Sequence, residues 1–350
     1  MGSNDTRQLD GIGGATSTTS KAAIVSRSST PGIDVEYTFA QVAVGKEVVD
    51  FSGNCGNIAS GVGPFAIDQG MIEVGFGQKQ VDIRILNTNT NVVIIETLQV
   101  DEHGCFEETG THKIAGLASP GSEIKVAFTN PAGSMTGQLF PTGCKNDRLV
   151  IDTEHGVFDI DVTMIDSGNP FAFVDASKLP LLPIGTLAEA LPLELLELVR
   201  QKAAVKMGLA PNIEMASLVR GTPKIAMVFP SDQGPRLFHR SVANSTASDI
   251  AVVALSMGKM HPTLQLTGAV ALSSALCVEG TVPFMLSSRA RSQESSEHFR
   301  NEQLCCIEHA GGCIHIDVVS QSDGQRVHVE KCTLSRTART LFEGLVMCHV

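Results

Sequence analysis

The stretch that decides the fold is SGNCGNIASGVGPFAIDQG, residues 52–70. It follows a run that predicts a strand, residues 42–51, and it continues through small and apolar residues that favour a tightly packed helix. Cys55 stands between Gly53 and Gly56 at this strand-to-helix turn, where backbone N–H groups point outward and the helix dipole favours a thiolate. Free cysteine is often only a small buried residue. The turn is therefore compatible with a reactive thiol and with a packed one.

Length and charge limit the classes of protein. The chain has 350 residues, enough for two domains that each bury a sizeable core. It has no Trp and one Tyr, so we expect a core of Val, Ile, Leu, Ala and Met. The net charge of −11 and the lack of a long Lys/Arg run argue against a nucleic-acid partner. No apolar run is long enough for a membrane span, so no membrane partner is expected.

The cysteines indicate a reducing compartment. There are nine, an odd number without regular framework spacing, which predicts a reduced, cytoplasmic protein. No His/Cys pair has zinc-finger spacing, so no metal is expected. The chain also lacks a nucleotide loop, an HExxH motif, a GxSxG elbow and a dinucleotide fingerprint.

The first half reads as strands around one helix. Residues 35–50 alternate in polarity and predict two strands with a turn at Gly45-Lys46. Further short strands are expected at 81–85, 92–98, 104–109, 123–128 and 157–164, between turns rich in Asn, Gly and Pro. One helix among many short antiparallel strands predicts an α+β fold, with the sheet curled around a central helix.

The second half repeats this plan. After a helix predicted at 186–208 and strands at 223–229 and 249–257, residues 264–280 again give a Gly-containing turn, a small-residue helix and a closing Gly. We therefore predict two pseudo-symmetric halves, each a β-barrel-like sheet around a central helix. Their expected bounds are 1–165, completed by 341–350, and 166–340.

Three polar segments remain. Residues 1–20 predict either a flexible tail or a hydroxyl-rich carboxylate cradle that ends at Lys21. Residues 286–303 predict a surface loop. Residues 334–344 predict a short helix with Arg336 and Arg339 on one face, either solvated or binding carboxylates.

Two helix N-termini in two similar halves suggest a cleft in which both dipoles point at one anionic ligand. The candidate reactive groups are Cys55 and Lys21, because either can carry a proton at neutral pH if its pKa is lowered. Such a pair suits proton abstraction next to a carboxylate-bearing carbon and return of the proton elsewhere.

Five motifs resemble the PrpF family over nearly the whole chain: residues 9–21, 52–57 with 62–66, 255–259 with His261, 266–269, and 334–339. That family holds 2-methylaconitate cis-trans isomerase, 3-methylitaconate delta-isomerase, 4-oxalomesaconate tautomerase and aconitate delta-isomerase. Its fold resembles diaminopimelate epimerase. Cys55-Gly56-Asn57 matches the first catalytic cysteine motif of that epimerase, whereas Gln265 stands about where the second cysteine would fall.

The resemblance implies a cofactor-independent isomerase that moves a double bond, or changes its cis/trans geometry, in an unsaturated di- or tricarboxylate. Lys21 and Cys55 would transfer the proton. The implied substrate contacts are Ser17, Thr18, Asn54, Gly56, Asn57, Lys259, His261, Thr267, Gly268 and Ala269. For His261 a structural role stays equally open. The alternatives are a keto-dicarboxylate tautomerase and a catalytically impaired binding or accessory protein.

The chain also departs from the family pattern. Met1 stands at a point that is internal in the family, whose members begin with a further strand and an Arg-Gly-Gly-Thr-Ser-Lys-Gly segment. We expect that strand and a hydroxyl donor of the site to be missing, in a truncated gene model, a genuine short form or an inactive protein. The expected partner is a small carboxylate substrate, and a homodimer is compatible with the sequence.

Overall fold

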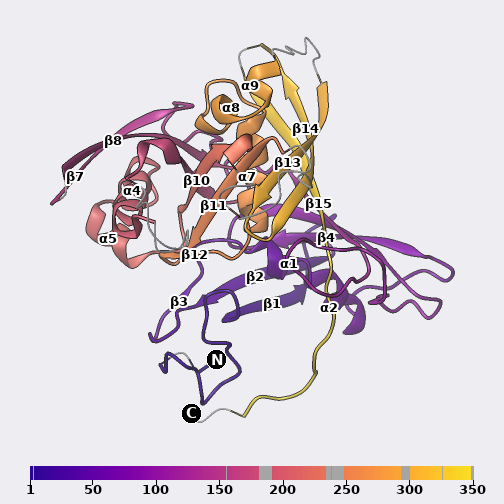
Figure 1. Cartoon of the computed structure of the whole chain (residues 1–350). Coiled ribbons are helices and arrows are strands. Elements are labelled where there is room, and N and C mark those ends of the chain that lie inside the picture. The colour runs from indigo at the N-terminus through magenta and orange to yellow at the C-terminus, as the bar shows by residue number, and fades with distance from the viewer. Residues whose placement is uncertain are drawn as a thin grey trace.

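The computed structural model describes residues 1–2, 4–154, 156–180, 191–233, 238, 248–292, 300–324 and 326–347. Its strands form one sheet, in the order β1-β2-β4-β5-β6-β15-β14-β13-β11-β10-β9-β8-β7, with β3 beside β2 and β12 beside β11. Figure 1 shows this sheet curling through a lower half in indigo and purple and an upper half in magenta to yellow. The strands are β1 Lys21–Arg27, β2 Val35–Val42, β3 Val49–Asp50, β4 Gln80–Asn87, β5 Val92–Gln99, β6 Ile124–Thr129, β7 Asp147–Thr153, β8 Gly156–Asp166, β9 Pro170–Asp175, β10 Lys224–Pro230, β11 Ile250–Ser256, β12 Lys259–Met260, β13 Arg300–His309, β14 Gly312–Ser322 and β15 Val327–Arg336.

Short helices complete the fold. They are α1 Gly56–Ala59, α2 Val62–Asp68, α4 Leu193–Lys206, α5 Ile213–Leu218, α7 Leu266–Leu276, α8 Val282–Leu286 and α9 Arg289–Ser292, with 3-10 turns at Ala176–Lys178 and Ser231–Gln233. In the described part of the chain, no helix is long and apolar enough to cross a membrane.

The two halves repeat one strand arrangement. In the lower half β1 and β2 are antiparallel, β2 and β4 are parallel, and β4, β5 and β6 are antiparallel. In the upper half β10, β11, β13, β14 and β15 repeat this pattern. The helices α1 and α2 follow β2 just as α7 follows β11. The predicted α+β fold with two pseudo-symmetric halves is therefore confirmed. One strand has no counterpart: β9 pairs with β10, but among the described residues no strand covers the equivalent edge of β1.

The two central helical units differ in length. All eleven residues of α7 are buried, as expected for a small-residue helix enclosed by a sheet. The single helix expected within residues 56–70 is instead broken into α1 and α2 at Ser60 and Gly61. Pro64 explains the break, because proline has no N–H to donate to the carbonyl four residues earlier. It is tolerated in the first turn of α2, where no intrahelical acceptor is needed.

Several local expectations fail. Residues 104–109 form only an isolated bridge between Val100 and Phe106. Residues 334–336 continue β15, because burial alternates along this strand, and no helix follows in residues 337–347. Of the loop predicted at 286–303, residue 286 ends α8, residues 289–292 form α9 and residues 300–303 belong to β13. Residues 293–299 of that loop lie outside the described residues, as do residues 186–190 at the start of the helix predicted at 186–208.

The C-terminal segment returns to the lower half, as Figure 1 shows. The backbone N–H of Thr340 donates to Glu108 Oε1 at 2.6 Å, and Gln69 Nε2 donates to Glu343 Oε1 at 3.1 Å. Residues 337–347 therefore lie along the strands and helices of the first half.

Glu96 ties α2 to the sheet. This buried residue of β5 accepts a hydrogen bond at Oε2 from Gly63 N, 2.8 Å away, in the first turn of α2. Its Oε1 has no partner among the described residues. Burial is the main cause that raises the pKa of Glu96 from 4.5 to about 8, so the carboxyl is largely protonated at neutral pH.

We predict that Glu96→Gln makes stability less dependent on pH. Because the folded pKa lies above the unfolded one, the native state binds more protons between pH 4.5 and 8, and stability falls as pH rises through that window. From pH 5 to pH 8 the free energy of unfolding of the natural protein should fall by on the order of 3 kcal/mol relative to that of Glu96→Gln. Urea unfolding at both pH values measures this. If the natural protein and Glu96→Gln differed in stability by the same amount at pH 5 and at pH 8, the Glu96 carboxyl would not titrate as described.

Candidate functional site

Lys21 and Cys55 lie in contact. Lys21 is the first residue of β1, Cys55 directly precedes α1, and Lys21 Nζ lies 3.2 Å from Cys55 Sγ. The Cys55 carbonyl accepts a hydrogen bond from the hydroxyl of the buried Tyr37, at 3.2 Å, which fixes the turn from the sheet side. The Lys21 ammonium also lies 5.9 Å from the centre of the Phe39 ring. The structure thus joins the two residues that the sequence singles out.

The loop before Lys21 is ordered by Gln8 rather than free. The side-chain oxygen of this buried glutamine accepts from Ala15 N at 2.7 Å and from Ser20 Oγ at 2.6 Å. These bonds close the loop directly before Lys21, so the flexible-tail interpretation of the segment is wrong.

Residues of the upper half hold the Cys55 turn. Asn54 N donates to Asn169 Oδ1 at 3.2 Å, and Gly221 N donates to Asp50 Oδ2 at 3.1 Å. Cys55 therefore lies at the junction of the two halves, and both halves position it.

Gly56 allows α1 and α7 to approach each other. A Cβ atom at Gly56 would overlap the fully buried side chain of Leu266, including its own Cβ atom at 2.9 Å. The absence of a side chain at Gly56 is thus a condition for bringing the starts of the two helices together.

Lys224 is a functional candidate that the sequence analysis missed. It is the first residue of β10, and its Nζ donates to Gly221 O at 3.2 Å. The pKa of Lys224 is lowered to about 8, mainly by burial and next by the positive charge of Lys21, while Cys55 and Asp50 oppose the shift. Lys224 therefore lies within electrostatic range of the Lys21–Cys55 pair. Its only sequence signal is a lone cation at the start of an apolar strand.

His261 is buried near both lysines. Its Nδ1 donates to Thr263 O at 2.8 Å. Burial, with smaller effects from the charges of Lys21 and Lys224, lowers the pKa of His261 to about 4. The imidazole is therefore neutral at physiological pH and adds no positive charge to the site.

Several buried polar groups without a protein partner belong to residues close to Gly56 and Leu266 in the chain and to Asn169, which bonds to Asn54. Among the described residues these include both side-chain atoms of Asn54, Asn169 Nδ2, Gln265 Oε1 and Thr267 Oγ1. Leaving such a group unpaired costs about 1–3 kcal/mol. Three of them can donate to a ligand carboxylate: Asn54, Asn169 and Thr267.

The remaining predicted contacts differ in their surroundings. The Ala269 N–H donates to Gln265 O at 2.9 Å, which is the first hydrogen bond within α7. The N–H groups before Ala269 in the first turn, including that of Gly268, have no acceptor within the helix and are the ones that could bind a ligand. Asn57 is exposed, and its Oδ1 accepts from Arg336 Nε at 3.4 Å.

Ser17, Thr18 and Lys259 are not brought to Cys55 by any contact in the described ranges. The Ser17 carbonyl accepts from Gln41 Nε2 at 3.1 Å, and the Thr18 hydroxyl bonds to that of Thr16 at 2.8 Å. Lys259 is exposed on β12. Their roles in substrate binding stay predictions.

Comparison with known proteins places this site in a family. The family model described as "PrpF protein" matches residues 1–349. The chain belongs to the PrpF family. It is 35% identical to 3-methylitaconate isomerase of Eubacterium barkeri, over 99% of this chain and 87% of that protein, and 34% identical to 2-methyl-aconitate isomerase of Shewanella oneidensis, over 97% and 84%. A crystal structure of methylitaconate-delta-isomerase superposes with a TM-score of 0.70 at 33% identity, covering 99% of this chain and 85% of the other.

In this PrpF-family chain, no three His, Cys, Asp or Glu side chains of the described segments gather in a group that could hold a metal ion. The site that the structure does show is a Lys–Cys pair with a second lysine, a neutral imidazole and unpaired amide and hydroxyl donors.

We predict that Lys224, and not Lys259, supplies a cation to the substrate. Lys224→Met should raise KM about ten- to a hundredfold, because it removes a charge-assisted hydrogen bond. In the natural protein KM should also rise above about pH 8, where Lys224 loses its proton, and Lys224→Met should lack this pH dependence. Steady-state kinetics from pH 6 to 9 test both points.

Two matched variants complete this test. Lys46→Met, at an exposed lysine, controls for the change of net charge. If Lys259→Met raises KM as much as expected for Lys224→Met, the assignment from the sequence is right and that from the structure is wrong.

Proposed function

We propose that this PrpF-family isomerase shifts a double bond, or changes its cis/trans geometry, in an unsaturated di- or tricarboxylate of the aconitate, methylaconitate or methylitaconate type. The observation that carries the proposal is the 3.2 Å contact between Lys21 Nζ and Cys55 Sγ. The names of the relatives, 2-methyl-aconitate isomerase and 3-methylitaconate isomerase, support the substrate class.

The proposed mechanism is proton transfer through this pair. One of the two groups removes a proton from the carbon next to the double bond, which leaves a carbanion delocalised over the neighbouring carbons and carboxylate. Return of a proton at another carbon of the same system, by the same group or by its partner, shifts the double bond. Return at the original carbon, after rotation within the delocalised carbanion, changes the cis/trans geometry. The substrate gains and loses one proton, so the reaction involves no net oxidation or reduction.

The surroundings of the pair suit an anionic substrate. Lys21 and Lys224 bring positive charge to one place, and the unpaired donors of Asn54, Asn169 and Thr267 can bind carboxylate oxygens. Donors fixed in advance also stabilise the negative charge that develops on the carbanion. This local field counteracts the chain's net charge of −11, which by itself would repel such substrates.

We further propose a reducing, cytoplasmic location. The odd number of cysteines supports it, because secreted proteins normally pair theirs.

We predict that Cys55→Ser and Lys21→Ala each reduce exchange of solvent deuterium into the substrate by about a hundredfold or more, because each removes one proton carrier. Purified protein is incubated in D₂O with cis-aconitate, 2-methylaconitate and 3-methylitaconate, and NMR follows deuterium incorporation and product. Lys46→Ala serves as the control for loss of a surface lysine. Unchanged exchange in both site variants would remove the pair from the mechanism.

The same incubation, extended to a keto-dicarboxylate and accompanied by a binding titration with trans-aconitate, decides between the alternatives. Double-bond isomers as products support the proposal. Exchange and a keto–enol product only with a keto-dicarboxylate would identify a tautomerase. Tight binding of trans-aconitate without exchange of any substrate would identify a binding protein.

A further inference from the structure

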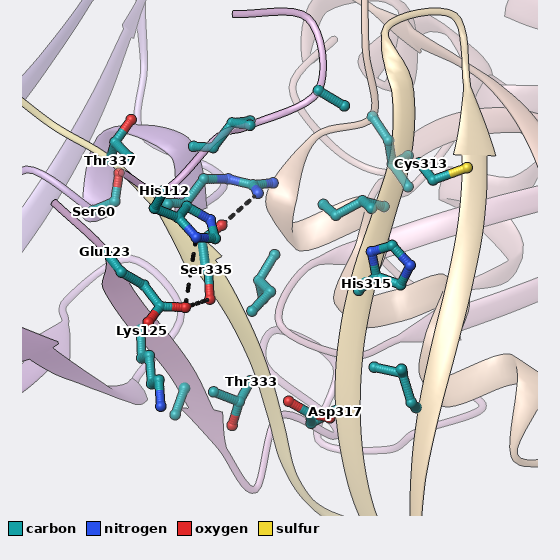
Figure 2. A pocket seen from close by; sticks show the side chains of 18 of the residues that line it. Ser60, His112, Glu123, Lys125, Cys313, His315, Asp317, Thr333, Ser335 and Thr337 are labelled. Carbon is teal, nitrogen blue, oxygen red and sulfur yellow. Dashed lines mark hydrogen bonds and ion pairs between the residues drawn. The ribbon is translucent and has the colours of Figure 1, made fainter. Parts of the chain in front are cut away.

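A second concave site lies between the halves, away from the Lys21–Cys55 pair. This groove has a volume of about 1070 Å³, and its walls include Asn57 of α1, Lys125 of β6 and Arg336 of β15. Figure 2 shows His112, Glu123 and Ser335 together on one wall, with His315 and Asp317 across from them. Lys21, Cys55, Lys224 and His261 are not part of its lining.

Arg336 is the unusual group in this groove. The residue is only 9% exposed. Its described hydrogen bonds go to uncharged oxygens, from Nε to Asn57 Oδ1 at 3.4 Å and from Nη1 to Ser335 O at 2.9 Å. Within the described residues no ion pair includes it.

The acidic residues of the groove do not neutralise this guanidinium. Glu123 accepts from Ser335 Oγ at 2.6 Å and lies 3.8 Å from His112 Nδ1 (Figure 2). Asp82, Glu302 and Asp317 also line the groove. Burial alone lowers the pKa of Arg336 to about 10, with no opposing effect from any carboxylate. A buried cation without a counter-charge is costly, and an oxyanion is the partner that guanidinium binds best.

We propose that this groove is a second ligand site, which binds a small anion through a carboxylate or phosphate group placed on Arg336. The apolar side chains Ile95, Leu264 and Leu334 also line the groove and can contact the rest of such a ligand. The site is independent of the proposed proton transfer, because none of the reacting groups belongs to it.

The test measures anion binding in a protein that lacks the two lysine side chains near Cys55. Lys21→Ala combined with Lys224→Ala weakens anion binding next to Cys55 and leaves the groove intact. Isothermal titration calorimetry with citrate and with inorganic phosphate then reports the groove, and the two probes show whether carboxylates or phosphates are preferred. Saturable binding of at least one probe is expected.

Two arginine variants in that background locate the anion. Arg336→Gln should weaken binding about tenfold or more, because it removes a charged hydrogen-bond donor. Arg339→Gln removes an exposed arginine three residues away and should leave binding unchanged. The proposal would be overturned if Arg336→Gln and Arg339→Gln bound the anion with equal affinity. It would also be overturned if neither probe bound to the protein that carries only Lys21→Ala and Lys224→Ala.

A further variant keeps the test decisive if Arg336→Gln does not fold. Thr337→Asp places a carboxylate on the groove wall beside Arg336, which supplies the missing counter-charge. It should fold and lose the anion, and undiminished binding by this variant would also contradict the proposal. Because no readout here depends on turnover, failure of the groove site and failure of the proposed isomerase chemistry are distinguishable.

Discussion

The close approach of Gly56 to Leu266 is the constraint on which the site depends. The two helical units belong to different halves of one sheet, and they meet at their first turns because Gly56 has no side chain where Leu266 is buried. Cys55 precedes the first of these helices and Thr267 lies in the first turn of the second. A larger residue at Gly56 would separate the halves, and would therefore move the thiol away from the donors that the upper half provides.

The junction of the two halves brings two lysine ammonium groups close together, which is energetically unfavourable. Lys21 and Lys224 interact with each other as like charges, and the hydrogen bond that Lys224 donates goes to the carbonyl of Gly221, before β10, rather than to a carboxylate. His261 stays neutral in the same surroundings. Under the proposed function, a substrate with two or three carboxylates would relieve this repulsion when it binds, so part of its binding energy would come from the unfavourable interaction of like charges in the free site.

The sequence predicted the parts of the site that are encoded locally. The strand-to-helix turn at Cys55 and the pseudo-repeat at Gly268 follow from glycine spacing, and Lys21 followed from its motif. Lys224 was missed because its relation to Cys55 exists only after β10 takes its place in the sheet, 169 residues further along the chain. The break at Ser60 was missed because small residues alone favour a helix, whereas Pro64 restarts it.

The turn at the start of α1 connects the Lys21–Cys55 pair with the proposed groove site. Cys55 has an extended backbone at the N-cap, with φ −125° and ψ 96°, whereas Asn57 lies within the helix. Cys55, at the N-cap, faces Lys21, and Asn57, two residues later, bonds to Arg336 in the groove. The contact with Lys21 and the wall of the groove are therefore formed by residues only two positions apart in the chain, although none of Lys21, Cys55 and Lys224 lines the groove.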